Sequence, residues 1–233
     1  ALGVYSTAIG GGGIFITMRS SSFGSANSQI SVYSSTVDNN FSAQDGGGIL
    51  IAPQLSNGAA SVITLNSTIS NNSATYLGGA VHHMNDGDFG GYASTISENT
   101  SVYGAGGISA SGAGATLALG SSIVAGNRST HSTQEMVVVN SAVLHPSSVG
   151  NIFGQSGFTY VESFAGDGTG ASNFFATSDG SDPRALSQII SPLGHNGGPT
   201  RTHALPVDSI ARDNGVAGIC NFVGSVDQRG PNN

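Results

Sequence analysis

The chain has 233 residues, of which 38% are hydrophobic and only 8% are charged, with a formal net charge of −7 at pH 7. The basic residues are all arginines and do not cluster, which excludes binding to nucleic acid or to an anionic membrane through a basic patch. No apolar run reaches roughly 18 residues, so we expect no direct membrane insertion. The apolar share is high enough to bury a core, which argues against disorder.

Two short phrases recur in step along the first half of the chain. One combines a small hydroxyl residue, a β-branched residue and an asparagine, and it occupies residues 35–40, 67–72, 94–99 and 121–127. The other is rich in glycine and ends in Ile or Val, and it occupies residues 11–14, 46–49, 78–81 and 104–108. Constant phrases at variable spacing predict short strands joined by loops of variable length, which is typical of a stacked solenoid.

Alternating apolar residues mark the strands within each repeat. Ile30 and Val32 share one face in the first copy, and Leu117 and Leu119 share one face in a later copy. Glycines allow sharp corners between such strands, and small and β-branched residues fill a narrow interior. We therefore predict an all-β fold, a right-handed parallel β-helix whose equivalent strands stack about 4.8 Å apart.

The recurring asparagines predict a hydrogen-bonded ladder along one corner of the coil. Asparagine tolerates the left-handed backbone region, and stacked side-chain amides bond one another from coil to coil. We expect this ladder to contain Asn40, Asn71, Asn99 and Asn127.

The repeats become less regular after Asn127. Residues 135–139, 141–144 and 158–161 are predicted to be further strands. We place the β-helix repeats at 1–165 and an irregular, loop-rich C-terminal cap at 166–233, packed on the last coil. Solenoids need such caps, because a bare end exposes apolar side chains and unpaired strand edges. The first repeat shows no comparable cap, so we expect self-association end to end.

Candidate metal ligands are sparse. The densest polar cluster, 82–88, contains Asp86 and Asp88, and its simpler interpretation is an exposed loop that closes one coil. Asp167, Asp179 and Asp182 stand on glycine-rich turns whose oxygens suit Ca²⁺, although neither turn has enough ligands alone. Ordinary turns are the alternative, and we expect no other cofactor.

Polysaccharide lyases and hydrolases also use parallel β-helices, so an enzyme is the natural rival to a structural protein. A lyase needs clustered carboxylates for Ca²⁺ and a basic residue that abstracts a proton, and this chain has no lysine. A glycosidase needs two carboxylates about 5–9.5 Å apart, and Asp38 and Glu98 stand at different steps of the repeated phrase, which weakens the case for a shared acidic column. We predict a non-enzymatic protein, with a carbohydrate-binding or polysaccharide-cleaving protein as the alternative.

The most specific sequence motifs lie in the C-terminal tail, within residues 166–233. Residues 191–205 read S-P-L-G-H-N-G-G-P-T-R-T-H-A-L, and residues 227–231 read D-Q-R-G-P. This text resembles the signature of choice-of-anchor bacterial surface domains, although the S-P-A-I-D core of that signature is rewritten at 208–213. The resemblance implies a secreted or cell-surface location in bacteria and a structural or adhesive role, with other surface proteins or glycans as partners. The tail residues expected to hold the cap by hydrogen bonds are His195, Asn196, His203, Asp227 and Arg229.

Overall fold

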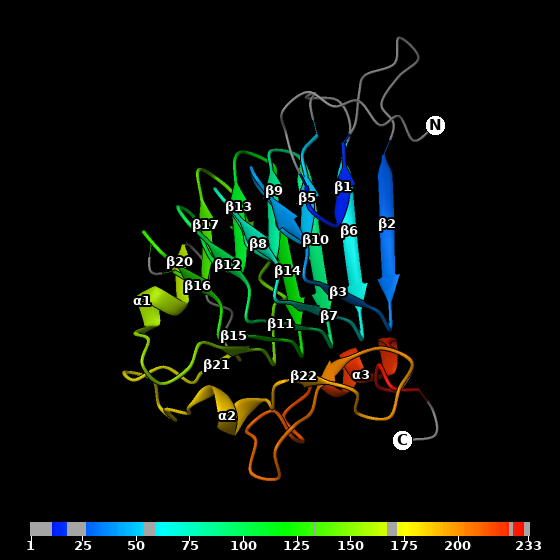
Figure 1. Cartoon of the computed structure of the whole chain (residues 1–233), viewed down its shortest axis with the longest axis vertical. Helices are drawn as coiled ribbons and strands as arrows, with labels where there is room; N and C mark the ends of the chain where they lie inside the picture. Colours follow the sequence, from blue (N-terminus) through cyan, green and yellow to red (C-terminus); the bar gives the residue numbers. More distant parts are fainter. Residues whose placement is uncertain are drawn as a thin grey trace.

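The computed structural model describes residues 11–17, 27–53, 59–132, 134–166, 172–223 and 226–230. In these residues, short parallel strands stack into a β-solenoid of about 5 turns, and the helices are short and lie in the C-terminal third (Figure 1). The predicted all-β parallel β-helix class is therefore confirmed.

Four parallel sheets run along the axis of the coil. The first sheet contains β1 (Ile14–Ile16), β5 (Ile49–Ile51), β9 (Val81–Met84), β13 (Ile108–Ser111), β17 (Met136–Val139) and β20 (Phe164–Gly166). The second contains β2 (Ser28–Tyr33), β6 (Ala60–Leu65), β10 (Gly87–Tyr92), β14 (Thr116–Gly120) and β18 (Val143–Leu144). The third contains β3 (Thr36–Asp38), β7 (Thr68–Ser70), β11 (Thr95–Ser97), β15 (Ile123–Ala125), β19 (Ile152–Phe153) and β21 (Phe174–Phe175). The fourth contains β4 (Phe41–Ser42), β8 (Ser73–Ala74), β12 (Thr100–Ser101) and β16 (Arg128–Ser129).

The remaining elements are the helix between β19 and β20 and the elements of the C-terminal tail. They are α1 (Tyr160–Ser163), α2 (Leu186–Ile189), α3 (Ala217–Phe222) and an antiparallel pair formed by β22 (Leu193–Gly194) and β23 (Thr202–His203). Residues 158–161 were expected to form a strand, but the helix α1 occupies this position and the strand that follows it is β20. Parallel pairing also continues to Phe174–Phe175, past the boundary expected at residue 165.

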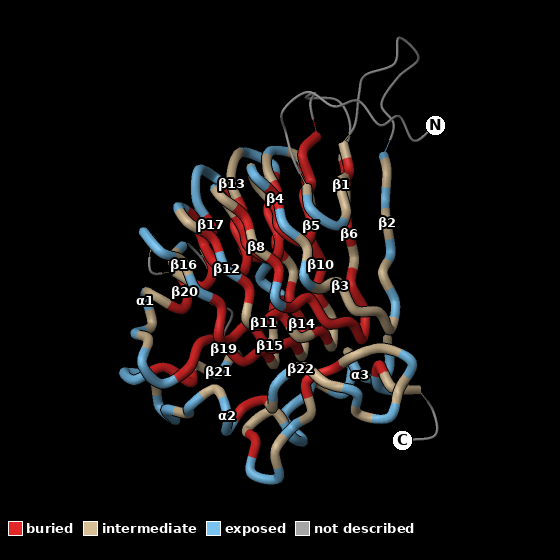
Figure 2. The backbone as a smooth tube through the Cα atoms, viewed as in Figure 1, coloured by how far each residue is buried: buried red, intermediate tan, exposed pale blue. Residues whose placement is uncertain are grey.

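The register of each sheet stacks similar side chains at equal heights. In the third sheet, the middle residues face the interior and pair in sequence from coil to coil: Val37, Ile69, Ile96, Val124 and Phe153. Fully burying an aliphatic side chain of this size contributes roughly 1.5–3 kcal/mol. The continuous apolar interior follows from this column and its equivalents, and Figure 2 shows buried backbone running through the coil while much of the tail stays exposed.

Candidate functional site: the groove beneath the C-terminal tail

The asparagine ladder exists, with one member different from the prediction. The Nδ2 atom of Asn40 donates to Asn72 Oδ1, Asn72 Nδ2 donates to Asn99 Oδ1, and Asn99 Nδ2 donates to Asn127 Oδ1, each at 2.9 Å. Asn71 is therefore the wrong residue. It is exposed and adopts a left-handed backbone with φ of 56°, which turns Asn72 into the coil. A constant offset of four residues from Thr36, Thr68, Thr95 and Ile123 identifies the correct asparagines.

The structure contains a second polar column, which was not predicted from the sequence. In each coil, the residue just before the third-sheet strand accepts a hydrogen bond from the backbone N–H of its equivalent in the preceding coil. Ser67, Ser94 and Ser122 accept through Oγ, and Asn151 and Asn173 accept through Oδ1. The recurring serine of the repeated phrase was the available signal. Both columns use polar side chains to satisfy buried backbone groups, so these residues hold the coil together.

The candidate metal ligands do not meet. His82 and His83 are buried on β9 instead of lying in an exposed loop, and burial lowers the pKa of each to about 4. Asp88 Oδ1 accepts the backbone N–H of Thr116 at 3.1 Å, and burial raises the pKa of this carboxyl. Asp86 lies in the turn between β9 and β10.

The other acidic candidates are engaged locally or lie outside the described residues. Asp179 accepts the backbone N–H of Tyr160 at 2.7 Å, and Asp182 pairs with Arg184 at 2.9 Å. Asp167 falls outside the part of the chain that the structure describes. Across the described residues, no three His, Cys, Asp or Glu side chains gather where they could hold a metal ion.

The tail packs on the side of the coil and does not close its last turn as predicted. It turns back along the outer face of the third sheet and reaches β3 in the first described coil, below the strands in Figure 1. The reason lies in the outward-facing residues of that sheet, which match the tail from end to end. Towards the C-terminal coils they are apolar, and Ile123, Ala125 and Ile152 pack with Ile189 and Ile190 of the tail.

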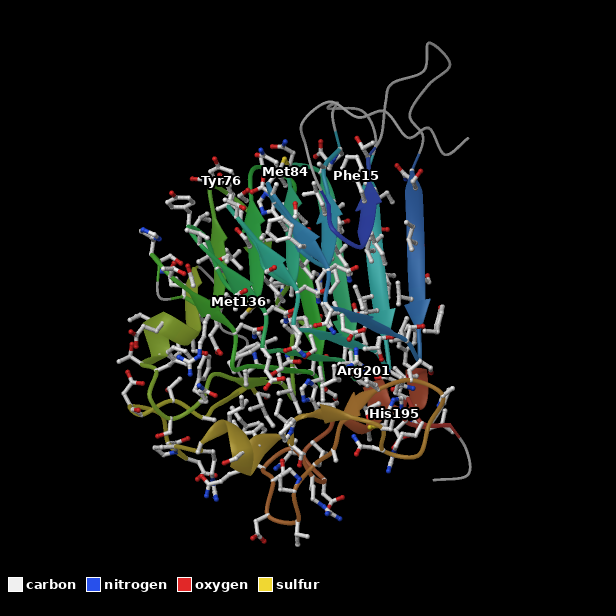
Figure 3. The ribbon with its side chains drawn as sticks, viewed as in Figure 1. Phe15, Tyr76, Met84, Met136, His195 and Arg201 are labelled. Atoms are coloured by element: carbon white, nitrogen blue, oxygen red, sulfur yellow. The ribbon has the colours of Figure 1, made fainter. Side chains whose placement is uncertain are left out.

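Towards the N-terminal coils the same face becomes polar, and the tail contacts become hydrogen bonds. Gln228 Nε2 donates to Thr36 Oγ1 at 2.9 Å, and Thr68 Oγ1 donates to Gln228 Oε1 at 2.7 Å. Arg201, labelled in Figure 3, forms an ion pair with Asp38 of β3. Gln228 and Arg201 were not among the predicted cap residues, because their partners lie more than 130 positions away in the sequence.

His203 is the predicted cap residue with the clearest structural role. Its Nδ1 lies 2.7 Å from the carbonyl oxygen of Ser191, and its Nε2 lies 3.0 Å from Ser70 Oγ. A carbonyl only accepts, so Nδ1 carries the proton and Nε2 accepts from the serine hydroxyl. Burial lowers the pKa of His203, which favours this neutral form.

The remaining cap residues act within the tail. Asn196 Nδ2 donates to the carbonyl oxygen of Thr202 at 2.8 Å and so closes the β22–β23 hairpin. Arg229 pairs with Asp227 through an Nε contact of 2.8 Å. His195, labelled in Figure 3, is exposed on the connection between β22 and β23.

A groove of about 880 Å³ separates part of the tail from the solenoid. Its floor is made of small and hydroxyl side chains from β11 and the adjoining corners, including Ser94, Thr95 and Ser121. Its other walls come from the tail and carry charges of both signs, with Arg212 and Asp213 exposed at the rim. The volume lies in the range of small-molecule sites, so this groove is the candidate ligand site.

Comparisons with protein-family models, with curated proteins and with solved structures find no match. In the described residues, no helix is long and apolar enough to cross a membrane.

Proposed function

We propose that this chain is a non-enzymatic structural or adhesive module of a secreted or surface-located bacterial protein, and that its coils assemble end to end. The resemblance of residues 191–205 and 227–231 to choice-of-anchor domains supports the location. The solenoid architecture supports the structural role, since a stack of coils supplies a long, rigid body.

One observation carries the assembly proposal: the same four sheets have an unpaired strand edge at both ends of the described coil. The strands with a free edge in the first described coil are β1, β2, β3 and β4, and those at the other end are β16, β18, β20 and β21, which belong to the last three coils. Unpaired parallel edges are templates for further strands. A second copy placed head to tail would continue each sheet, and a head-to-tail contact that does not close generates a filament.

Exposed apolar side chains at the two rims support the same contact. Tyr33 and Phe41 are 62% and 66% exposed in the first described coil, and Val143 on β18 and Val161 on α1 are 48% and 63% exposed towards the other end. α1 and the loop before it cover part of the last coil beside β16, as the contact of the Arg128 guanidinium with the Phe158 ring illustrates. The contact between copies would therefore be made chiefly by the first, second and third sheets.

Electron microscopy and light scattering of concentrated protein test the proposal. We expect fibres or concentration-dependent growth in mass, and we expect Val143→Asp to abolish both while the circular dichroism spectrum stays unchanged. Val207→Asp is the matched control, because Val207 is 83% exposed but lies in the tail, away from the strand edges. Monomeric short rods at high concentration would refute the assembly proposal.

The groove favours glycan binding as a second candidate function. Its hydroxyl-lined floor and charged rim offer donors and acceptors for sugar hydroxyls. Titration of acidic and neutral oligosaccharides, followed by NMR, would shift resonances of Thr95 and Arg212 in the case of binding. Asp86 and Asp88 do not line this groove, so polysaccharide cleavage that is lost in Asp86→Ala or Asp88→Ala would point to a separate site.

A further inference from the structure

The asparagine ladder ends on a carboxyl group. The backbone N–H of Asn99 donates to Asn127 Oδ1 at 3.2 Å, and the backbone N–H of Asn127 donates to Glu135 Oε1 at 2.9 Å. Glu135 is fully buried. Its carboxyl group therefore takes the acceptor position that the next side-chain amide would occupy.

A change in the glycine-rich phrase makes room for this replacement. The residue just before each first-sheet strand is small in the earlier coils, namely Gly13, Gly48, Ala80 and Gly107. A Cβ atom on Gly107 would lie 3.0 Å from Asn127 Cγ, so the ladder amide already fills that space. In the coil that begins with β17 this position carries Glu135, and Ser156 stands at the register position of the missing asparagine. One long side chain thus replaces the short residue and the amide together.

The second carboxyl oxygen of Glu135 replaces the side-chain Nδ2 group of the ladder asparagines. In every earlier rung, that Nδ2 group donates a hydrogen bond. Asn127 Nδ2 donates to the carbonyl oxygen of Ile96 at 2.9 Å, and the other ladder amides donate in the same way. Glu135 Oε2 is buried without a hydrogen-bond partner among the described residues, and so are Gln155 Oε1 and Ser163 Oγ. Ser163 precedes Phe164, which pairs with Met136, so it is the neighbour of Glu135 on the next strand.

Among the described residues, no cation forms an ion pair with this carboxyl group, and Arg128 acts on it only as a more distant charge. Arg128, on the adjoining β16, lies with its guanidinium 5.5 Å from the centre of the Phe158 ring and is exposed. Glu162, on α1, is engaged with the backbone N–H of Thr159 at 2.7 Å. An unpaired carboxylate is strongly unfavourable in a buried position, whereas a neutral acid carries no charge and provides an O–H donor.

We propose that Glu135 is a proton-binding site: as a neutral acid it forms the last rung of the ladder, and loss of its proton loosens the segment 155–166 from β17. Burial raises the pKa of Glu135 to about 8, against the opposing effects of the N–H groups of Asn127 and Gly126 and of the Arg128 charge. A raised pKa means that this contribution to stability is complete below the ordinary value of 4.5 and is lost as the pH rises through about 8.

The test compares the wild-type chain with Glu135→Gln, in which the amide keeps both the acceptor and the donor. Hydrogen exchange of residues 155–166 is measured at pH 6 and at pH 9.5, with the two proteins compared at the same pH. We expect similar protection at pH 6 and at least tenfold faster exchange in the wild type at pH 9.5. Equal protection at both pH values would overturn the proposal.

Infrared spectroscopy gives a second readout on the wild type alone. At pH 6, a carbonyl band of a buried carboxylic acid should be present and should disappear on raising the pH through 8. Titration with Na⁺ or Ca²⁺ at pH 6 separates a proton from a metal ion. An absent acid band, or a melting temperature that rises with either cation, would overturn the assignment.

Discussion

Thr68 donates a hydrogen bond of 2.7 Å to Gln228, and so joins β7 to a tail residue 160 positions later in the chain. The same glutamine donates to Thr36 at 2.9 Å, one coil earlier. Two rungs of one hydroxyl column are therefore engaged by a single tail side chain. This bond pair holds the tail to the side of the coil and leaves the strand edges at the coil ends uncovered by it.

Gln228→Ala should release the end of the tail without unfolding the coil. The substitution removes the bonds to Thr36 and Thr68, while the apolar packing of α2 on Ile123 remains. Limited proteolysis should cleave between residues 204 and 230 several-fold faster than in the wild type, with the melting temperature of the coil changed little. Gln29→Ala is the control, because Gln29 is exposed on β2. Equal cleavage rates in both variants would contradict the attachment described for the tail.

Asn72→Ala should strongly destabilise the coil, whereas Asn71→Gly should not. Loss of the Asn72 amide removes the acceptor of the Asn40 backbone N–H and the side-chain donor to the carbonyl oxygen of Val37, whereas the carbonyl oxygen of Ser70 keeps the N–H of Asn39 at 3.4 Å. Unsatisfied buried groups cost about 1–3 kcal/mol each. We expect a loss of roughly 3 kcal/mol or more in the free energy of unfolding for Asn72→Ala. Glycine at position 71 keeps the left-handed backbone, so a change below about 0.5 kcal/mol is expected. Urea titrations decide between the two asparagines.

Gly107→Ala should be far more costly than Gly218→Ala. A Cβ atom at position 107 would lie 2.8 Å from the carbonyl oxygen of Glu135, whereas one at position 218 has no heavy atom within 4 Å. Overpacking of this kind typically costs about 1–3 kcal/mol. In α3, replacing glycine by alanine should be neutral or stabilise by up to about 1 kcal/mol. Thermal unfolding of the two variants measures the difference, and similar melting temperatures would be inconsistent with the tight column at position 107.

Acid should destabilise the coil through the buried histidines. The folded-state pKa values of His82 and His83 lie below the ordinary value of 6.5, at about 4. Their contribution is therefore present above pH 6.5 and is lost as the pH falls through about 4. Urea unfolding at pH 7 and pH 4 should show a clear loss of stability at the lower pH. His83→Leu should reduce that loss, whereas His195→Asn, at an exposed position, should leave it unchanged. If the loss of stability between pH 7 and pH 4 is the same in the wild type and in both variants, groups other than these histidines cause the acid sensitivity.

The sequence by itself determined the architecture. The repeated phrases specify short strands, their glycine corners and an amide column, because each coil must satisfy the same steric and hydrogen-bonding needs as its neighbour. The class of fold and three of the four ladder asparagines follow from that local repetition. Asn71 was chosen over Asn72 because a two-residue doublet hides which asparagine takes the left-handed backbone and which one faces inward.

Only the tertiary structure decided where non-repeating residues act. Gln228 and Arg201 find partners in the first described coil, and neither local propensity nor spacing encodes a contact across more than 150 positions. Glu135 looks like an ordinary charged residue at the start of a strand. Its role as the last rung depends on three coils stacking in register, since only that packing removes water from the carboxyl group and sets it against Asn127.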